Sequence, residues 1–155
     1  MPNVKRYYYH PLTNGSNSIK KVLPAILTSS DYIKSHYSKP AYGQKGDITS
    51  LNYDNWTWVH FGSNGQVLDP YKLLPTIFEE IDVEKLDLLM GSDELADGGA
   101  AMMAYAKMQF SEMSEQEREA IAAALLKYCE LDTFAMVLLY LHFKEITDQP
   151  AKKAA

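Results

Sequence analysis

A long stretch of helix-favouring residues, roughly Glu115–Ile146, fills the second half of this sequence and limits the folds open to the chain. Ser114 followed three residues later by Glu117 is a capping box, which predicts that the helix begins there. Gln149-Pro150 predicts its end. Together with shorter helical and extended segments upstream, this stretch predicts an α-rich α+β fold with a long C-terminal helix.

One carboxylate interrupts an apolar stripe of this predicted helix. At about 100° per residue, four apolar side chains point within about 20° of Asp132: Ile121, Leu125, Leu139 and Phe143. Tyr128 and Met136 lie within about 40°. A buried, unpaired carboxylate is very costly, so it must find a metal, a cation or hydrogen-bond donors, or take up a proton. Asp132 is therefore a candidate functional residue, and an aspartate bonded to a backbone amide or an arginine is the purely structural alternative.

The segment Phe134–Phe143 is apolar on nearly every side, since Phe134 and Leu141 lie roughly opposite the Asp132 stripe. A helix that is apolar all round is expected to be buried all round. A missing sheet, a partner chain or self-association would cover it. Cover by the short helices and by Trp56, Trp58 and Phe61 is the alternative.

The N-terminal third alternates β-prone and helical segments. Val4–His10 is rich in β-prone residues and predicts a strand that Pro11 closes. Apolar residues recur at helical spacing over Ile19–Ile26, but Pro24 predicts two short pieces or a kink. Asp31–Tyr37 predicts another turn or two of helix.

Turn-forming residues divide the rest of the chain. Residues 38–55 are polar and rich in Pro and Gly, which predicts a long loop. Asn64-Gly65 predicts a β-hairpin near residues 56–68. Asp97-Gly98-Gly99 predicts the entrance to a helix over Ala100–Phe110.

Composition limits the number of domains and the cellular setting that we expect. With 155 residues, of which 46% are hydrophobic, we expect a single domain over residues 1–147 and a flexible tail over 148–155. The lone cysteine excludes an internal disulfide framework and a cysteine-rich zinc site. No apolar run reaches the roughly 18 residues of a membrane span, and the first residues lack the apolar segment of a secretion signal, so we expect a cytoplasmic protein.

Charge is unevenly distributed along the chain. The net charge of −5 combines +4 over residues 1–75 with −9 over residues 76–155. A basic first half suits phosphates and an acidic second half suits a divalent cation, although a solvated surface explains both. Lys20-Lys21 is placed to meet a phosphate at a helix start. Tyr7, Tyr8 and Tyr9 beside Lys5-Arg6 suit stacking on bases, or else a half-buried strand.

Three blocks carry a family resemblance. Tyr128–Thr133, with the sequence YCELDT, resembles the third motif of the DEDD-type 3′–5′ exonucleases of the tyrosine subgroup. Gly15–Ala25 and Ala96–Ala101 resemble segments of the bacterial domain of unknown function family 2779, whose large members contain such a nuclease-like domain. The resemblance extends from about Tyr7 to Phe143.

This resemblance implies an RNase H-like (DnaQ-like) fold, in which four carboxylates hold two Mg²⁺ or Mn²⁺ ions near the scissile phosphate. By this resemblance Asp132 is the last metal-binding carboxylate and Tyr128 orients the attacking water. The chain departs from the pattern upstream, because its one Asp-x-Glu, Asp82-Val83-Glu84, follows Phe78–Ile81 instead of an apolar strand.

The expected function follows from that departure. The chain corresponds to the C-terminal part of a metal-dependent nuclease module that cleaves single-stranded DNA or RNA, and it is inactive without the upstream carboxylates. We expect no membrane partner, and either a homo-oligomer or contact with the missing N-terminal part. The alternative is a non-catalytic interaction domain that docks through its apolar C-terminal helix.

Overall fold

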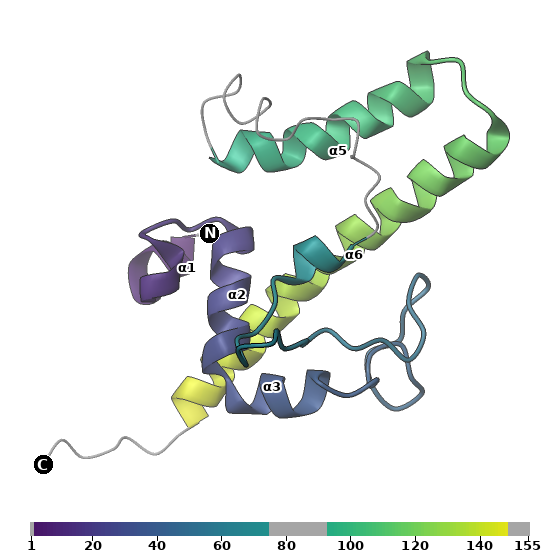
Figure 1. Ribbon diagram of the computed structural model, residues 1–155. Coiled ribbons are helices and arrows are strands. Elements are labelled where there is room, and N and C mark those ends of the chain that lie inside the picture. The colour runs from purple at the N-terminus through teal and green to yellow at the C-terminus, as the bar shows by residue number, and fades with distance from the viewer. Residues whose placement is uncertain (1, 75–92, 149–155) are drawn as a thin grey trace, which may run out of the picture. The chain divides into compact units, whose positions relative to one another are not determined.

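The computed structural model describes residues 2–74 and 93–148 of the chain (Figure 1). The chain divides into a first unit, Met1–Lys72 with Leu131–Ala155, and a second unit, Leu73–Glu130. A single domain over residues 1–147 stays a prediction. The predicted tail, 148–155, lies outside the described residues except for Asp148, the last residue of the C-terminal helix.

Helices dominate both units, which confirms the α-rich prediction. Their order along the chain is α1 (Pro2–Tyr7), η1 (Pro11–Thr13), α2 (Ile19–Ser29), α3 (Asp31–Tyr37), η2 (Pro70–Leu73), α5 (Asp93–Phe110) and α6 (Glu115–Asp148). The predicted long C-terminal helix is therefore confirmed as α6 (Figure 1). Within the described ranges, no helix is long and apolar enough to cross a membrane.

The predicted hairpin near residues 56–68 is present in a reduced form. Phe61 and Val67 form an isolated antiparallel bridge, and the Gly62 amide donates to the Gln66 carbonyl at 2.9 Å. Gly65 has a φ of +77°, a conformation that suits glycine in a tight turn. Over residues 2–74 and 93–148 the pairing goes no further than isolated bridges, so the β part of the predicted α+β fold is small.

The strand predicted over Val4–His10 is wrong, because residues 2–7 form α1. The Tyr8 amide donates to the Val4 carbonyl at 3.0 Å, which extends the helical pattern by one bond. Val4, at 1% exposure, is the residue that anchors this helix in the core. A β-prone segment needs a neighbouring strand to satisfy its backbone, and the described part of the chain offers it none.

Helix α2 is continuous through Pro24, so two separate pieces are ruled out, and the predicted alternative, a kink at Pro24, stays a prediction. Five of its side chains are buried: Val22, Leu23, Ala25, Ile26 and Leu27. Ser30 ends α2 and starts α3, and its hydroxyl accepts a hydrogen bond from the Ile33 amide at 3.1 Å. Burial of one face offsets the backbone bond that Pro24 removes.

Aromatic rings fill the core of the first unit beside the loop that was predicted over residues 38–55. The rings that contact one another are Tyr37, Tyr42, Tyr53, Trp56, Trp58 and Phe134. Phe134 joins α6 to this cluster, and its ring centroid lies 4.5 Å from that of Tyr42 and 5.1 Å from that of Tyr37. Gly43 (φ +85°) allows the close approach, because a Cβ there would lie 2.4 Å from the Tyr53 carbonyl oxygen. The predicted long loop is thus ordered by its aromatic residues.

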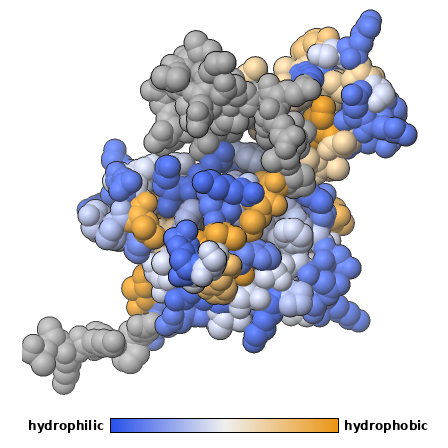
Figure 2. All heavy atoms as spheres, in the orientation of Figure 1, coloured by the Kyte–Doolittle hydropathy of each residue, from blue (hydrophilic) through white to orange (hydrophobic). Residues whose placement is uncertain are grey.

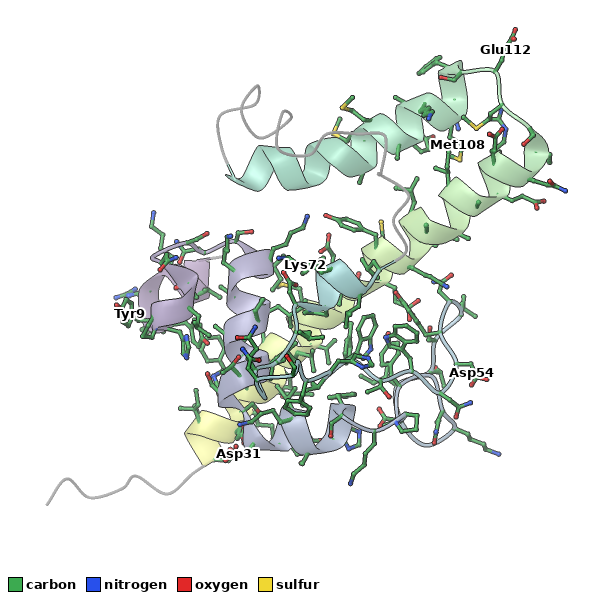
Figure 3. All side chains as sticks on the ribbon, in the orientation of Figure 1. Tyr9, Asp31, Asp54, Lys72, Met108 and Glu112 are labelled. Carbon is green, nitrogen blue, oxygen red and sulfur yellow. The ribbon has the colours of Figure 1, made fainter. Side chains whose placement is uncertain are left out.

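In the second unit, α5 and the first part of α6 are joined by a short connection (Figures 1 and 3). Helix α5 begins at Asp93, so Gly98-Gly99 lies inside it and the predicted helix entrance at Asp97 is wrong. The Arg118 guanidinium donates to the Met108 carbonyl oxygen and ties the two helices together. Asp82-Val83-Glu84 lies outside the described residues.

The predicted capping box of α6 is confirmed. The Glu117 amide donates to the Ser114 hydroxyl oxygen at 3.2 Å, and the Ser114 amide donates to the Glu117 carboxylate at 2.8 Å. These bonds hold the pKa of Glu117 below its usual value, because both Ser114 groups donate to the charged form.

The buried face of α6 in the first unit is not the one centred on Asp132. Leu131, Leu138 and His142 are almost fully buried, and their common direction lies about 100° round the helix from Asp132. The described residues of this chain do not cover Phe134–Phe143 on all sides, because Met136 and Tyr140 are 48% and 65% exposed. Cover by a missing sheet, a partner chain or self-association stays a prediction. On the face shown in Figure 2, apolar and polar side chains of the described residues are interspersed.

Candidate functional site

Asp132 lies at the edge of the buried face of α6 and is half-buried. Its Oδ1 accepts a hydrogen bond from the Tyr71 hydroxyl at 2.6 Å. That length is typical of a hydroxyl donating to an ionised carboxylate. The carboxylate therefore has a tyrosine donor in place of the backbone amide or arginine of the structural alternative.

Helix η2 positions the tyrosine. Asp69 precedes Pro70, and its carboxylate accepts a hydrogen bond from the Tyr71 amide at 3.0 Å. This Asx-type bond, with a buried Pro70, fixes the backbone where the chain turns into η2. This backbone geometry places the phenol of Tyr71 beside Asp132 of α6.

A cation completes the group. The Lys20 ammonium lies 5.2 Å from the centre of the Tyr71 ring. Lys20 comes from the first turn of α2, so three segments distant in sequence meet at the cluster of Lys20, Tyr71 and Asp132. A cation over a phenol ring gains electrostatic stabilisation of roughly 0.5–2 kcal/mol, depending on desolvation.

The other two predicted site residues lie apart from this cluster. Lys21 follows Lys20, is exposed, and points about 100° away round α2. Tyr128 lies one helical turn before Asp132 in α6, in the part of the helix that belongs to the second unit. The structure thus brings Lys20 together with Asp132 through Tyr71, and the roles assigned to Lys21 and Tyr128 stay predictions.

The described residues do not by themselves fit a two-metal centre. Residues 2–74 and 93–148 contain no group of three or more His, Cys, Asp or Glu side chains able to hold a metal ion. Two divalent cations need several oxygen ligands, and this cluster offers one carboxylate. No hydrolytic step is therefore assigned to the described chain alone.

A second polar group ties α6 to the start of α3. The Glu145 carboxylate accepts bonds from the Ser30 hydroxyl and from the Tyr32 amide, the latter at 3.2 Å. His142 is 5% exposed, its Nδ1 lies 3.9 Å from Glu145, and its ring meets the Tyr8 ring edge-on. Burial lowers the pKa of His142 more than the nearby Glu145 carboxylate raises it. This group joins the ends of helices and stabilises the first unit.

Sequence reasoning missed Tyr71 and the buried role of His142. The Asp69-Pro70 pair was a signal for a fixed turn, but nothing local says that the next side chain reaches a residue 61 positions away. His142 lacks ligand spacing to other histidines, and its partners come from distant segments.

Comparison of this chain with protein-family models, with curated proteins and with solved structures found no match.

Proposed function

We propose that this chain is the C-terminal part of a metal-dependent 3′–5′ exonuclease-like module of RNase H-like fold. In the complete module Asp132 is one of the carboxylates that hold Mg²⁺ or Mn²⁺, and Tyr128 is the tyrosine beside it. Carboxylates supplied from outside this chain complete the site. The chain alone has no nuclease activity.

One observation carries the proposal: a half-buried carboxylate held by a tyrosine hydroxyl with a lysine above the same ring. The single hydroxyl engages Oδ1, and a carboxylate has about four lone-pair sites on its two oxygens. The fold therefore orients the Asp132 carboxylate, and its other lone-pair sites can still bind a cation. An aspartate at the edge of the buried face also suits a site completed by further elements.

Charge supports the same proposal. The first unit carries eleven Lys and Arg against seven Asp and Glu, and the second carries four against thirteen. The unit that contains Asp132 is thus basic overall, as expected for a protein that contacts a phosphate backbone.

The test uses Mn²⁺ as a paramagnetic probe, in a longer polypeptide that supplies the upstream carboxylates. Mn²⁺ bound at Asp132 broadens the amide NMR signals of the residues around it in α6, and Asp132→Asn removes that local broadening. Asp148→Asn, an exposed acid of the same helix, is the matched control and leaves the broadening around Asp132 unchanged. Equal broadening in wild type and Asp132→Asn contradicts the metal role.

A second candidate function rests on a different observation. Met136, Val137 and Tyr140 are 48%, 37% and 65% exposed on one side of α6 in the first unit. Exposed apolar residues on one helix face are typical of a docking surface. Light scattering separates the two candidates. Stable oligomers that ignore Mn²⁺ and that Val137→Glu dissociates favour the interaction domain, whereas a monomer in both proteins contradicts self-association.

A further inference from the structure

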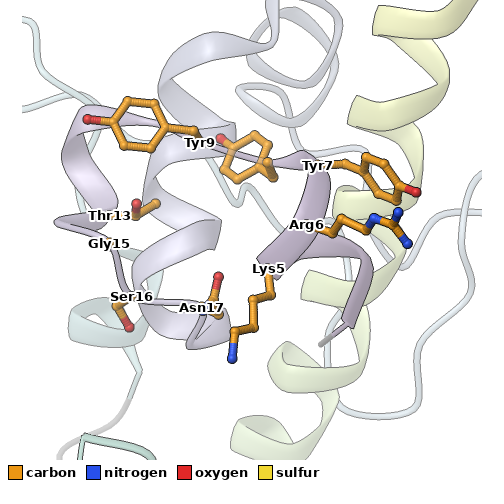
Figure 4. A pocket seen from close by; sticks show the side chains of 9 residues that line it. Lys5, Arg6, Tyr7, Tyr9, Thr13, Gly15, Ser16 and Asn17 are labelled. Carbon is orange, nitrogen blue, oxygen red and sulfur yellow. The ribbon is translucent and has the colours of Figure 1, made fainter.

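A cavity of about 430 Å³ lies at the N-terminal end of the first unit. Its lining comes from the last turn of α1, the residues that follow it, and the segment of residues 13–17. Figure 4 shows the Lys5 side chain extending from α1 toward Asn17, with Arg6 and Tyr7 beside each other. Its volume lies within the range of roughly 300–1,000 Å³ that small-molecule sites occupy.

The described residues of the lining are positively charged overall. Lys5 and Arg6 are both exposed, and the nine lining residues include no Asp or Glu. The first acidic residue of the whole sequence is Asp31. Two cations in a lining whose described residues hold no carboxylate attract an anion, and lysine and arginine both donate hydrogen bonds to phosphate.

Hydroxyl and amide groups line the same cavity, and Figure 4 shows Asn17 near the end of the Lys5 side chain, with Arg6 farther away beside Tyr7. Ser16 Oγ accepts a hydrogen bond from the Ser18 amide at 3.2 Å, so its own O–H is oriented and can still donate. Asn17 supplies a side-chain amide beside it. These groups add neutral donors to the charged ones, as phosphate sites commonly combine them.

Two exposed aromatic rings frame the same cavity. Tyr7 is 68% exposed and Tyr9 is 82% exposed, and Figure 3 shows Tyr9 at the outer edge of the first unit. The Arg6 guanidinium lies 5.3 Å from the centre of the Tyr7 ring, which keeps cation and ring together. Neither ring is needed for the core, since Val4 and Tyr8 are the residues of this segment that pack inward.

We propose that this cavity binds a phosphate group that carries an aromatic base, as at the end of a single-stranded nucleic acid. Lys5 and Arg6 hold the phosphate, Ser16 and Asn17 donate to it, and Tyr7 and Tyr9 stack on bases. The combination of basic groups with exposed rings favours nucleic acid over a simple anion, because successive bases stack on aromatic side chains. This inference rests on the proposed function for its class of ligand, but its residues are separate from Asp132.

Fluorescence anisotropy with a labelled twelve-residue oligothymidine tests the site, in EDTA so that no metal takes part. Lys5→Gln with Arg6→Gln is expected to weaken binding and to reduce the slope of log affinity against log salt by about 1.4, since each lost phosphate contact removes about 0.7. Tyr7→Leu with Tyr9→Leu is expected to weaken binding at least about fivefold. Because all four side chains are exposed, circular dichroism is expected to show unchanged helix content.

Lys39→Gln with Lys45→Gln is the matched control, because it removes the same charge from exposed positions of the same unit. Binding that this control weakens as much as the cavity variants do overturns the proposal in favour of general attraction. Competition identifies the ligand. Thymidine 5′-monophosphate is expected to compete better than inorganic phosphate, and equal competition by the two overturns the role of the base.

Asp132→Asn keeps the two proposals distinguishable. It is expected to bind the oligonucleotide like wild type, because EDTA removes any metal contribution. Normal binding by the Lys5 and Arg6 double variant, together with Mn²⁺ broadening that depends on Asp132, overturns this inference and leaves the proposed function standing. Weakened binding by the Lys5 and Arg6 double variant, without Mn²⁺ broadening that depends on Asp132, supports this inference and contradicts the proposed function.

Discussion

The hydrogen bond from Tyr71 to Asp132 predicts a measurable coupling between two residues 61 positions apart. Removing the hydroxyl by Tyr71→Phe leaves the ring in place and takes away the donor of the 2.6 Å bond. Hydrogen bonds to charged groups contribute about 1.5–3 kcal/mol to stability. Both side chains are half-buried, so we expect the lower end, about 1.5 kcal/mol.

A double-mutant cycle isolates this term. Tyr71→Phe, Asp132→Asn and the double variant are unfolded in urea, followed by tryptophan fluorescence. Both tryptophans belong to the first unit, and Trp58 is 2% exposed, so the signal reports the unit that contains the bond. The two single changes are expected to be non-additive by about 1–1.5 kcal/mol.

Tyr9→Phe is the control, because its ring is 82% exposed, and we expect a change in the free energy of unfolding within about 0.5 kcal/mol. Additive single changes, with a coupling below about 0.3 kcal/mol, would refute the reasoning. In that case the tyrosine does not orient the carboxylate, and Asp132 is no better placed than any surface acid.

Three further predictions follow from other contacts. Phe134→Ala removes a ring from the aromatic cluster and is expected to lower the free energy of unfolding in urea by about 3–5 kcal/mol, a loss below about 1.5 being inconsistent with the packing described. Folding lowers the pKa of His142 below its ordinary value of 6.5, so as the pH falls the unfolded chain takes up a proton at a higher pH than the folded chain does. Stability is then expected to be full above pH 6.5 and to fall as the pH drops below it, and His142→Gln should flatten this part of the urea-midpoint profile. For Glu117, NMR titration in Ser114→Ala is expected to show the pKa returning toward its ordinary value of 4.5, and an unchanged pKa would contradict the capping box.

The sequence predicted best where structure is local. The start of α6 was predicted correctly because Ser114 and Glu117 satisfy each other's backbone three residues apart. The helix over Asp31–Tyr37 was also predicted correctly, and the structure shows that Ser30 is its N-cap. In both cases the residues that decide the structure are sequence neighbours.

Prediction from the sequence failed where contacts between distant segments decide the structure. Phe134–Phe143 is apolar nearly all round, so periodicity could not say which side packs inward. The aromatic loop decides it, by surrounding Phe134 and leaving Met136 outside. The strand predicted over Val4–His10 was wrong for a related reason, because the described part of the chain offers its β-prone residues no strand to pair with.

The candidate site likewise contains residues that one segment identifies and a residue that only a distant contact reveals. Asp132 was identified from its own helix, because a carboxylate in an apolar stripe is visible in one segment. Lys20 was predicted to meet a phosphate at a helix start, and the structure places its ammonium over the Tyr71 ring. Tyr71 itself, which connects the two, was not predictable from local sequence.

The most direct measurement of the central claim is nuclease activity in a longer polypeptide that supplies an Asp-x-Glu motif upstream of this chain. With Mn²⁺ and a 3′-labelled single strand, we expect release of labelled nucleotides that Asp132→Asn abolishes and Asp148→Asn leaves unchanged. Release that continues undiminished in Asp132→Asn would contradict the assignment of Asp132 as a metal-binding carboxylate.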